Sequence, residues 1–73
     1  MDLMRLVGRN VRRIRREQRL TQEQLADRCD HSQQYVSDLE RGKQNATLKS
    51  IAAIAAALEV SHLELFRDVN DKG

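Results

Sequence analysis

The sequence predicts an all-α fold. Residues that favour strands are scarce, with one tyrosine, one phenylalanine and no tryptophan among 73 residues. Leucine, alanine, arginine, glutamate and glutamine, which favour helices, are abundant. Apolar residues also recur at helical spacing, and residues that commonly begin helices precede the apolar runs. A chain of this length with 40% hydrophobic residues forms one small domain, which we place at residues 1–73.

An amphipathic helix is predicted over residues 3–18. Its apolar side chains fall within a sector of about 140°, the width of a core-facing stripe; they are Leu3, Leu6, Val7, Val11 and Ile14. The opposite side is a basic face about 80° wide, made of Arg5, Arg9, Arg12, Arg16 and Arg19. Arg15 lies at the margin of the apolar stripe. The basic face is either solvated or in contact with phosphate groups.

A second, shorter helix is predicted over residues 22–29. Thr21 and Gln24 form a capping box that begins it. Its inward side chains are Leu25, Ala26 and Cys29. Residues 30–32 then interrupt the pattern, so the chain turns quickly into the next helix.

A third helix is predicted over residues 33–41. Ser32 is a suitable N-cap, and Gly42 is a natural residue to follow the last turn. Val36 and Leu39 anchor this helix to the core, and Glu40 is turned toward the core side. The outer face is short and polar, with Gln33, Gln34, Tyr35, Ser37, Asp38 and Arg41.

Two more helices are predicted, over residues 48–58 and 62–67. Thr47 caps the first, whose inner stripe is Leu48, Ile51, Ile54, Ala55 and Leu58. On its other face, the alanines at positions 52, 53, 56 and 57 carry no charge, so the helix is apolar nearly all round, which implies burial on both sides or a partner. Ser61 and Glu64 form a capping box before the last helix. Residues 70–73 read as a frayed tail.

Charge is unevenly distributed along the chain. Residues 1–20 contain seven arginines against two acids, whereas the remainder has nine acids against six lysines and arginines. A basic pole of this kind hints at a polyanionic partner. The longest apolar run, residues 51–58, is far short of the ~18 residues of a membrane span, so no membrane association is expected. The single Cys29 fits a buried apolar role and a cytoplasmic protein.

The unit from Gln22 to Arg41 resembles the helix-turn-helix of the phage repressor and Cro-like family, also described as Xre-type or lambda repressor-like. Apolar or small residues stand where its two helices must touch, and the resemblance extends to the runs 20–26 and 39–43. It implies a five-helix lambda repressor-like DNA-binding domain with a central motif at residues 21–42. Two residues depart from the family pattern: Asp30 replaces a turn glycine, and His31 replaces an apolar residue. Asp adopts the left-handed conformation at modest cost, so the turn is expected to form.

The resemblance also implies which residues touch DNA. Base contacts are expected from Gln33, Gln34, Ser37 and Asp38, because glutamine pairs with adenine and a carboxylate accepts from cytosine. Asp38 could equally be a solvated charge or a partner of Arg41. Phosphate contacts are expected from Gln22, Ser32, Tyr35, Arg41, Lys43 and Asn45. Packing is the alternative for Tyr35, and helix capping with Thr21 is the alternative for Gln22.

Two structural roles complete the interpretation. Arg15 and Glu40 resemble the pair that bridges the first and third helices of the family, and a partly buried salt bridge is predicted. Because one short recognition helix contacts few bases, such domains act in pairs. A dimer interface is expected from Val60, Leu63, Leu65, Phe66, Ala53 and Ala57. Leu63 and Phe66 could instead belong to the core, which leaves Leu65 as the better candidate for an exposed residue.

These features predict a homodimeric, sequence-specific transcriptional regulator that binds a palindromic operator in double-stranded DNA. The layout is similar to small phage repressors and to controller proteins of restriction-modification systems. The alternative is a protein-interaction module of the antitoxin or adaptor type with secondary DNA binding. An enzyme is not expected, since no nucleophile has a nearby base. No cofactor, metal ion or small-molecule effector is expected either.

Overall fold

The computed structural model describes residues 2–68. These residues form four α-helices and one 3₁₀ helix: α1 (Leu3–Glu17), α2 (Gln22–Cys29), α3 (Gln33–Glu40), α4 (Leu48–Leu58) and η1 (His62–Phe66). No strand occurs within this part of the chain, so the all-α prediction is confirmed. The expected fifth α-helix is instead the 3₁₀ helix η1, and the expected frayed tail at 70–73 lies outside the described residues.

Local capping defines where each helix begins. The side chains of Asp2, Thr21, Ser32 and Thr47 each accept a hydrogen bond from a backbone N–H in the first turn that follows. At α2 the capping box is complete, because Gln24 Oε1 also accepts from the backbone N–H of Thr21 at 2.8 Å. Such caps satisfy N–H groups that have no partner within the helix.

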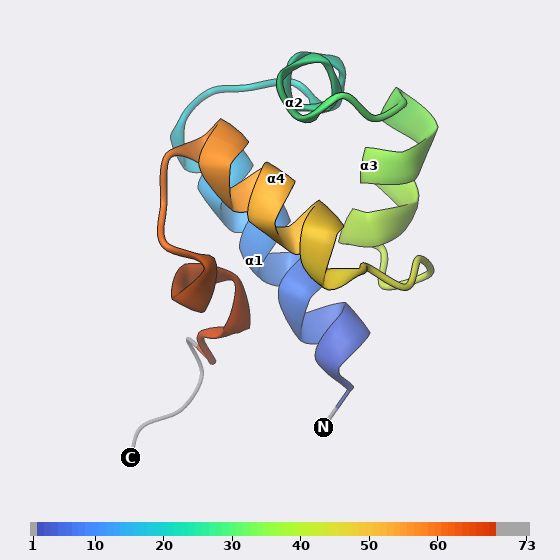
Figure 1. The fold of residues 1–73 in the computed structure, drawn as a ribbon, viewed down its shortest axis with the longest axis vertical. Coiled ribbons are helices and arrows are strands. Elements are labelled where there is room, and N and C mark those ends of the chain that lie inside the picture. The colour runs from blue at the N-terminus through green and yellow to red at the C-terminus, as the bar shows by residue number, and fades with distance from the viewer. Residues whose placement is uncertain (1, 69–73) are drawn as a thin grey trace.

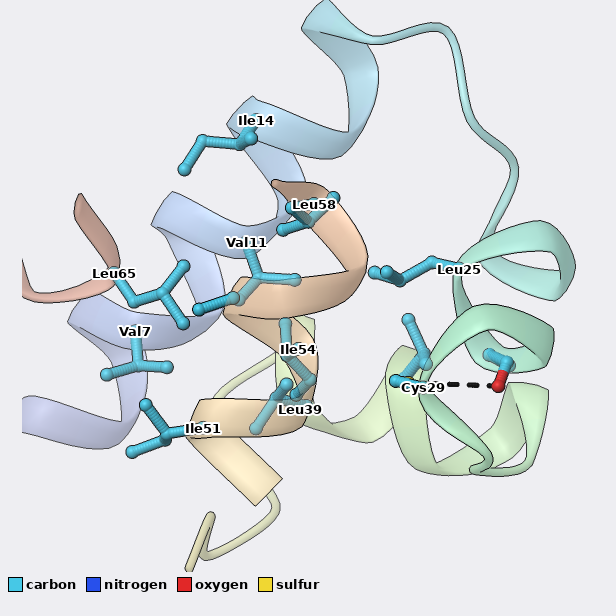
Figure 2. Packing of buried hydrophobic residues seen from close by; sticks show 13 residues of the cluster. Val7, Val11, Ile14, Leu25, Cys29, Leu39, Ile51, Ile54, Leu58 and Leu65 are labelled. Atoms are coloured by element: carbon cyan, nitrogen blue, oxygen red, sulfur yellow. Dashed lines mark hydrogen bonds between the residues drawn. The ribbon is translucent and has the colours of Figure 1, made fainter. Parts of the chain in front are cut away.

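The helices pack around one core (Figure 1). In this view α4 crosses in front of α1, α2 lies at the top, α3 lies at the right, and η1 lies at the lower left. Figure 2 shows side chains from all five elements converging, among them Val11 of α1, Leu25 of α2, Leu39 of α3, Ile54 of α4 and Leu65 of η1. Each of these five is almost completely buried.

A glycine allows α1 and α3 to approach closely. A Cβ atom at Gly8 would collide with the carbonyl oxygen of Leu39 and lie 2.9 Å from that of Glu40. Only glycine therefore fits at this crossing, although glycine weakens a helix. The close contact fixes the C-terminal end of α3 against α1.

The short helix η1 corrects one expectation. Leu65 is fully buried, whereas Leu63 is 68% exposed. A 3₁₀ helix has three residues per turn, so its side chains point in directions that differ from those of an α-helix. Asn10 anchors this segment to α1, because its Nδ2 donates to the carbonyl oxygens of Leu65 at 2.8 Å and Arg67 at 2.7 Å. The prediction that Leu65 is exposed was wrong.

The alanines of α4 divide into two pairs. Ala53 and Ala57 are half-buried and pack against the core, whereas Ala52 and Ala56 are exposed. The two alanines chosen for a dimer interface are thus the less accessible pair. The two pairs are ~100° apart on the helix and flank the buried stripe on opposite sides, so the packing of neighbouring elements decides which pair is covered.

Among the described residues, no helix combines the length and apolar character needed to cross a membrane.

Candidate nucleic-acid interface

The turn between α2 and α3 sets the relative direction of the two helices. Asp30 ends α2 in the left-handed conformation, with φ 59° and ψ 42°. The N–H of His31 then donates to the carbonyl oxygen of Ala26 at 3.0 Å, which closes the end of the helix. Ser32 begins α3 two residues after Asp30. The aspartate therefore occupies the backbone position where the resembled family carries glycine.

The outer face of α3 carries a short hydrogen-bonded chain. Nε2 of Gln34 donates to Oδ1 of Asp38 at 2.9 Å, and Nη2 of Arg41 donates to the same oxygen at 2.9 Å. Asp38 is thus a partner of Arg41, as one of its two alternatives predicted. Gln33 and Gln34 are exposed, and Ser37 is half-buried. Gln34 retains its Oε1 and one N–H for a further partner.

Glu40 lies at the centre of a buried network behind this face. Nε and Nη2 of Arg15 donate to its two carboxylate oxygens at 2.6 and 3.0 Å. The Arg15 side chain is 10% exposed and that of Glu40 is 3% exposed. Nη1 of Arg15 also donates to the carbonyl oxygen of Leu20 at 2.7 Å. This bidentate pair connects α1, the chain that follows it, and α3.

Gln22 joins the same network from α2. Its Nε2 donates to Oε1 of Glu40 at 3.1 Å. Gln24 rather than Gln22 completes the cap with Thr21, so the capping alternative for Gln22 is wrong. Sequence reasoning missed the contact between Gln22 and Glu40, since the two residues come from different helices. The contact orients Gln22 beside the first turn of α2.

The remaining candidates for phosphate contacts differ in exposure. Arg41, Lys43 and Asn45 are exposed at its C-terminal end, and Ser32 is exposed at its beginning. Tyr35 behaves differently. Its ring stacks on His31 with centroids 4.1 Å apart, and its hydroxyl is buried with no hydrogen-bond partner in the part of the chain described. The structure favours the packing alternative for Tyr35.

Cys29 is a core residue near the turn. Its thiol is buried, and its Sγ lies 3.7 Å from the carbonyl oxygen of Ala26 (Figure 2). Burial raises the pKa of this thiol above its ordinary value of 9.0, because desolvation disfavours the thiolate. The thiol therefore stays protonated at neutral pH, as expected for a small apolar residue.

Comparisons of the chain with known proteins agree with the geometry of α2, the turn and α3. A helix-turn-helix family model matches residues 11–65. The chain belongs to the helix-turn-helix family. An uncharacterized HTH-type transcriptional regulator of Sinorhizobium fredii, y4dJ, is 52% identical to this helix-turn-helix protein over 65 residues, which cover 89% of this chain and 84% of the relative.

Two solved structures resemble this helix-turn-helix protein closely. The hypothetical transcription factor NHTF from Neisseria superposes with a TM-score of 0.90 at 35% identity, covering 94% of this chain and 79% of the other. The restriction-modification controller protein C.AhdI from Aeromonas hydrophila has a TM-score of 0.84 at 35% identity, covering 86% and 96%. The predicted family is confirmed. Its members are regulators rather than enzymes, as the sequence predicted.

Proposed function

We propose that this protein is a sequence-specific transcriptional regulator that places α3 in the major groove of double-stranded DNA. The observation that carries the proposal is the outer face of α3, where Gln33 and Gln34 are exposed, while Glu40 at the end of the same helix is held in a buried ion pair with Arg15 of α1. Rigid support matters because a base contact requires a fixed direction of the helix. The likeness to a controller protein and to transcriptional regulators supports the same function.

The side chains of this face match the chemistry of base edges. A glutamine amide pairs with N6 and N7 of adenine through one donor and one acceptor. The contact with Asp38 leaves Gln34 with one of each. Asp38 carries a negative charge toward DNA, so it accepts from cytosine N4 or rejects other bases by repulsion. Ser37 completes the base-reading set.

Contacts with the DNA backbone would be made on both sides of the recognition helix α3. Gln22 and Ser32 stand at the beginnings of α2 and α3, where backbone N–H groups favour anions. Arg41, Lys43 and Asn45 would form the second bracket after α3. These contacts fix the position of the protein on DNA without selecting a sequence.

The proposed regulator acts as a homodimer on a palindromic operator. Exposed apolar side chains supply a surface for a second copy: Leu63, with half-buried Val60 and Phe66, and the exposed alanines Ala52 and Ala56. This set replaces the expected Leu65, Ala53 and Ala57. Two copies related by a two-fold axis would present their α3 helices to half-sites separated by about one helical turn of DNA.

The test compares binding of the wild type and Gln34→Ala to the DNA upstream of the protein's own gene and to a scrambled duplex. Fluorescence anisotropy should show preference for the native duplex in the wild type and loss of that preference in the variant. A lost bidentate pair corresponds to ~1–3 kcal/mol, or roughly a 5- to 150-fold change in affinity.

Gln44→Ala is a suitable control, since Gln44 follows α3 and lines a pocket between α1 and α4. It should retain the preference for the native duplex. Equal, weak binding of the wild type to both duplexes would contradict the proposal and would favour a protein-interaction module of the antitoxin or adaptor type.

A further inference from the structure

A groove runs between α1, α2 and α3 beside the candidate interface. Its volume is about 340 Å³, and its lining includes Arg12, Arg15, Arg16, Gln22, Ser37 and Arg41. Glu40 is the one acidic residue in the lining. Four arginines thus gather in a hollow surface that touches all three helices involved in the candidate site.

The charges of this groove are only partly compensated. Glu40 neutralises Arg15, and Arg41 is paired with Asp38. Within residues 2–68, neither Arg12 nor Arg16 forms an ion pair. Both side chains are exposed. The groove therefore presents two unneutralised guanidinium groups to a ligand.

A neighbouring groove provides an internal comparison. It lies against the N-terminal half of α1, and its charged lining residues are Asp2, Arg5, Arg9, Glu40, Arg41 and Asp68. Acids and bases balance there. The five arginines of the basic face of α1 are therefore not equivalent, because only Arg12 and Arg16 line the groove beside α3. Arg9 lines the balanced groove and also a third hollow along α1, together with Arg12, Arg13 and Arg16.

The groove adjoins the outer face of α3 and the first residue of α2. Ser37 and Arg41 belong to the outer face of α3, and Gln22 is the first residue of α2. A DNA strand that flanks α3 would pass the open side of this groove. Arginine presents several N–H donors in a planar fork that matches the oxygens of a phosphate group.

We propose that the groove holds a phosphodiester of the DNA backbone and that Arg12 and Arg16 are its donors from α1. The two residues are four positions apart on one helix, so their Cβ atoms are roughly 5–6 Å apart and both can reach one phosphate or two adjacent ones. The proposal rests on the proposed function, because it assumes that α3 faces DNA.

The test compares Arg12→Gln and Arg16→Gln with the matched control Arg9→Gln. All three changes remove one positive charge from the same face of α1, and Arg9 does not line the groove beside α3. Binding to operator and scrambled DNA is measured across 50 to 300 mM salt, after circular dichroism shows that the variants are folded. The first two variants should weaken binding to both duplexes equally. Each should reduce the salt slope by about one phosphate contact, or ~0.9.

Methylphosphonate substitution locates the contact. A neutral linkage placed at successive positions of the duplex should weaken wild-type binding at one or two positions beside the recognition site. At those positions the penalty should be smaller in Arg12→Gln and in Arg16→Gln, because one of the two donors is already missing, and it should be unchanged in Arg9→Gln. This double comparison separates a local contact from a general loss of charge.

Three outcomes would overturn the proposal or separate it from the proposed function. Arg12→Gln and Arg16→Gln variants that match Arg9→Gln in affinity and salt slope would overturn it, even if the wild type selects its operator. Inorganic phosphate that stabilises the wild type against heat but not Arg16→Gln, with equal DNA binding by all variants, would identify a free-anion site instead. If the wild type shows no sequence preference and Arg16→Gln still loses one phosphate contact, the groove proposal holds and sequence-specific function fails.

Discussion

At the scale of single residues, Glu40 organises the candidate site. Its carboxylate accepts hydrogen bonds from Arg15 and from Gln22, although it is almost fully buried. A buried carboxylate is tolerated only where donors compensate its lost hydration. The contact with Gln22 also means that a residue expected at the DNA backbone is oriented by the same group that holds α3.

We predict that Glu40→Ala destabilises the protein by about 3–5 kcal/mol, because it leaves the Arg15 guanidinium buried without its partner. Urea or thermal unfolding measures this loss. Asp38→Ala should cost less than about 1 kcal/mol, since Asp38 pairs with an exposed arginine.

A double variant distinguishes an effect of Glu40 on folding stability from an effect on DNA recognition. In Glu40→Leu combined with Arg15→Met, no charge remains buried, so most of the stability should return. An unchanged melting temperature in Glu40→Ala together with weaker operator binding would show that Glu40 acts directly on DNA and would contradict its structural role.

At the scale of elements, the α2–α3 turn depends on one backbone conformation. Asp30 adopts φ 59°, a region in which residues other than glycine are strained by contact between Cβ and the backbone. The helix crossing depends on Gly8 in a comparable way, since a side chain there would collide with α3. At both positions, the residue type that fits is decided by the space around the backbone rather than by side-chain chemistry.

We predict opposite effects for two substitutions that remove the same carboxylate. Asp30→Gly should stabilise the protein by roughly 0.5–1 kcal/mol, because glycine adopts positive φ without strain. Asp30→Ala should destabilise it by about 1 kcal/mol, because alanine keeps the Cβ and loses the local polar side chain. Chemical unfolding of both variants measures the difference. Changes of the same sign would mean that the carboxylate, not the backbone, determines stability here.

At the scale of the whole molecule, η1 contributes one residue to the core and another, two positions away, to the surface. Leu65 fills the core, and Leu63 faces solvent. Asn10 holds the segment in place from the middle of the apolar stripe of α1. The exposed Leu63 therefore lies on a segment that hydrogen bonds hold against α1.

We predict that Leu63→Glu converts the proposed dimer to a monomer while its helical circular dichroism is unchanged, since a charge at an exposed apolar contact opposes burial. Sedimentation velocity at micromolar concentration measures the oligomeric state. Leu65→Glu should instead unfold the protein. A Leu63→Glu variant that sediments like a dimeric wild type would exclude η1 from the interface.

Much of the fold and part of the site were predictable because they depend on local interactions. Thr21, Ser32 and Thr47 begin helices through hydrogen bonds from residues three positions further along the chain. Four residues of the apolar stripe of α1 are buried, as helical geometry alone predicts, whereas Leu3 is 56% exposed. The pairing of Arg15 with Glu40 was available only from the resemblance to a known family, because the two residues are 25 positions apart.

Other features required the packed structure, for a physical reason. A side chain at the edge of an apolar stripe becomes buried or exposed when the helix rotates by a few tens of degrees. The sequence does not fix that rotation, so packing decided the burial of Tyr35, Leu65 and the alanines of α4. Asn10 carried an unused signal, since a polar residue inside an apolar stripe needs a buried partner.

The sequence by itself determined that this chain forms capped, amphipathic helices with a helix-turn-helix at their centre, because those properties arise within a few residues of each other. Only the tertiary structure decided that Gln22 joins Glu40, that Gly8 sets the crossing of α1 and α3, and that Arg12, Arg15 and Arg16 of α1 line the groove beside α3. These are contacts between separate helices, and their partners are fixed only when the helices pack.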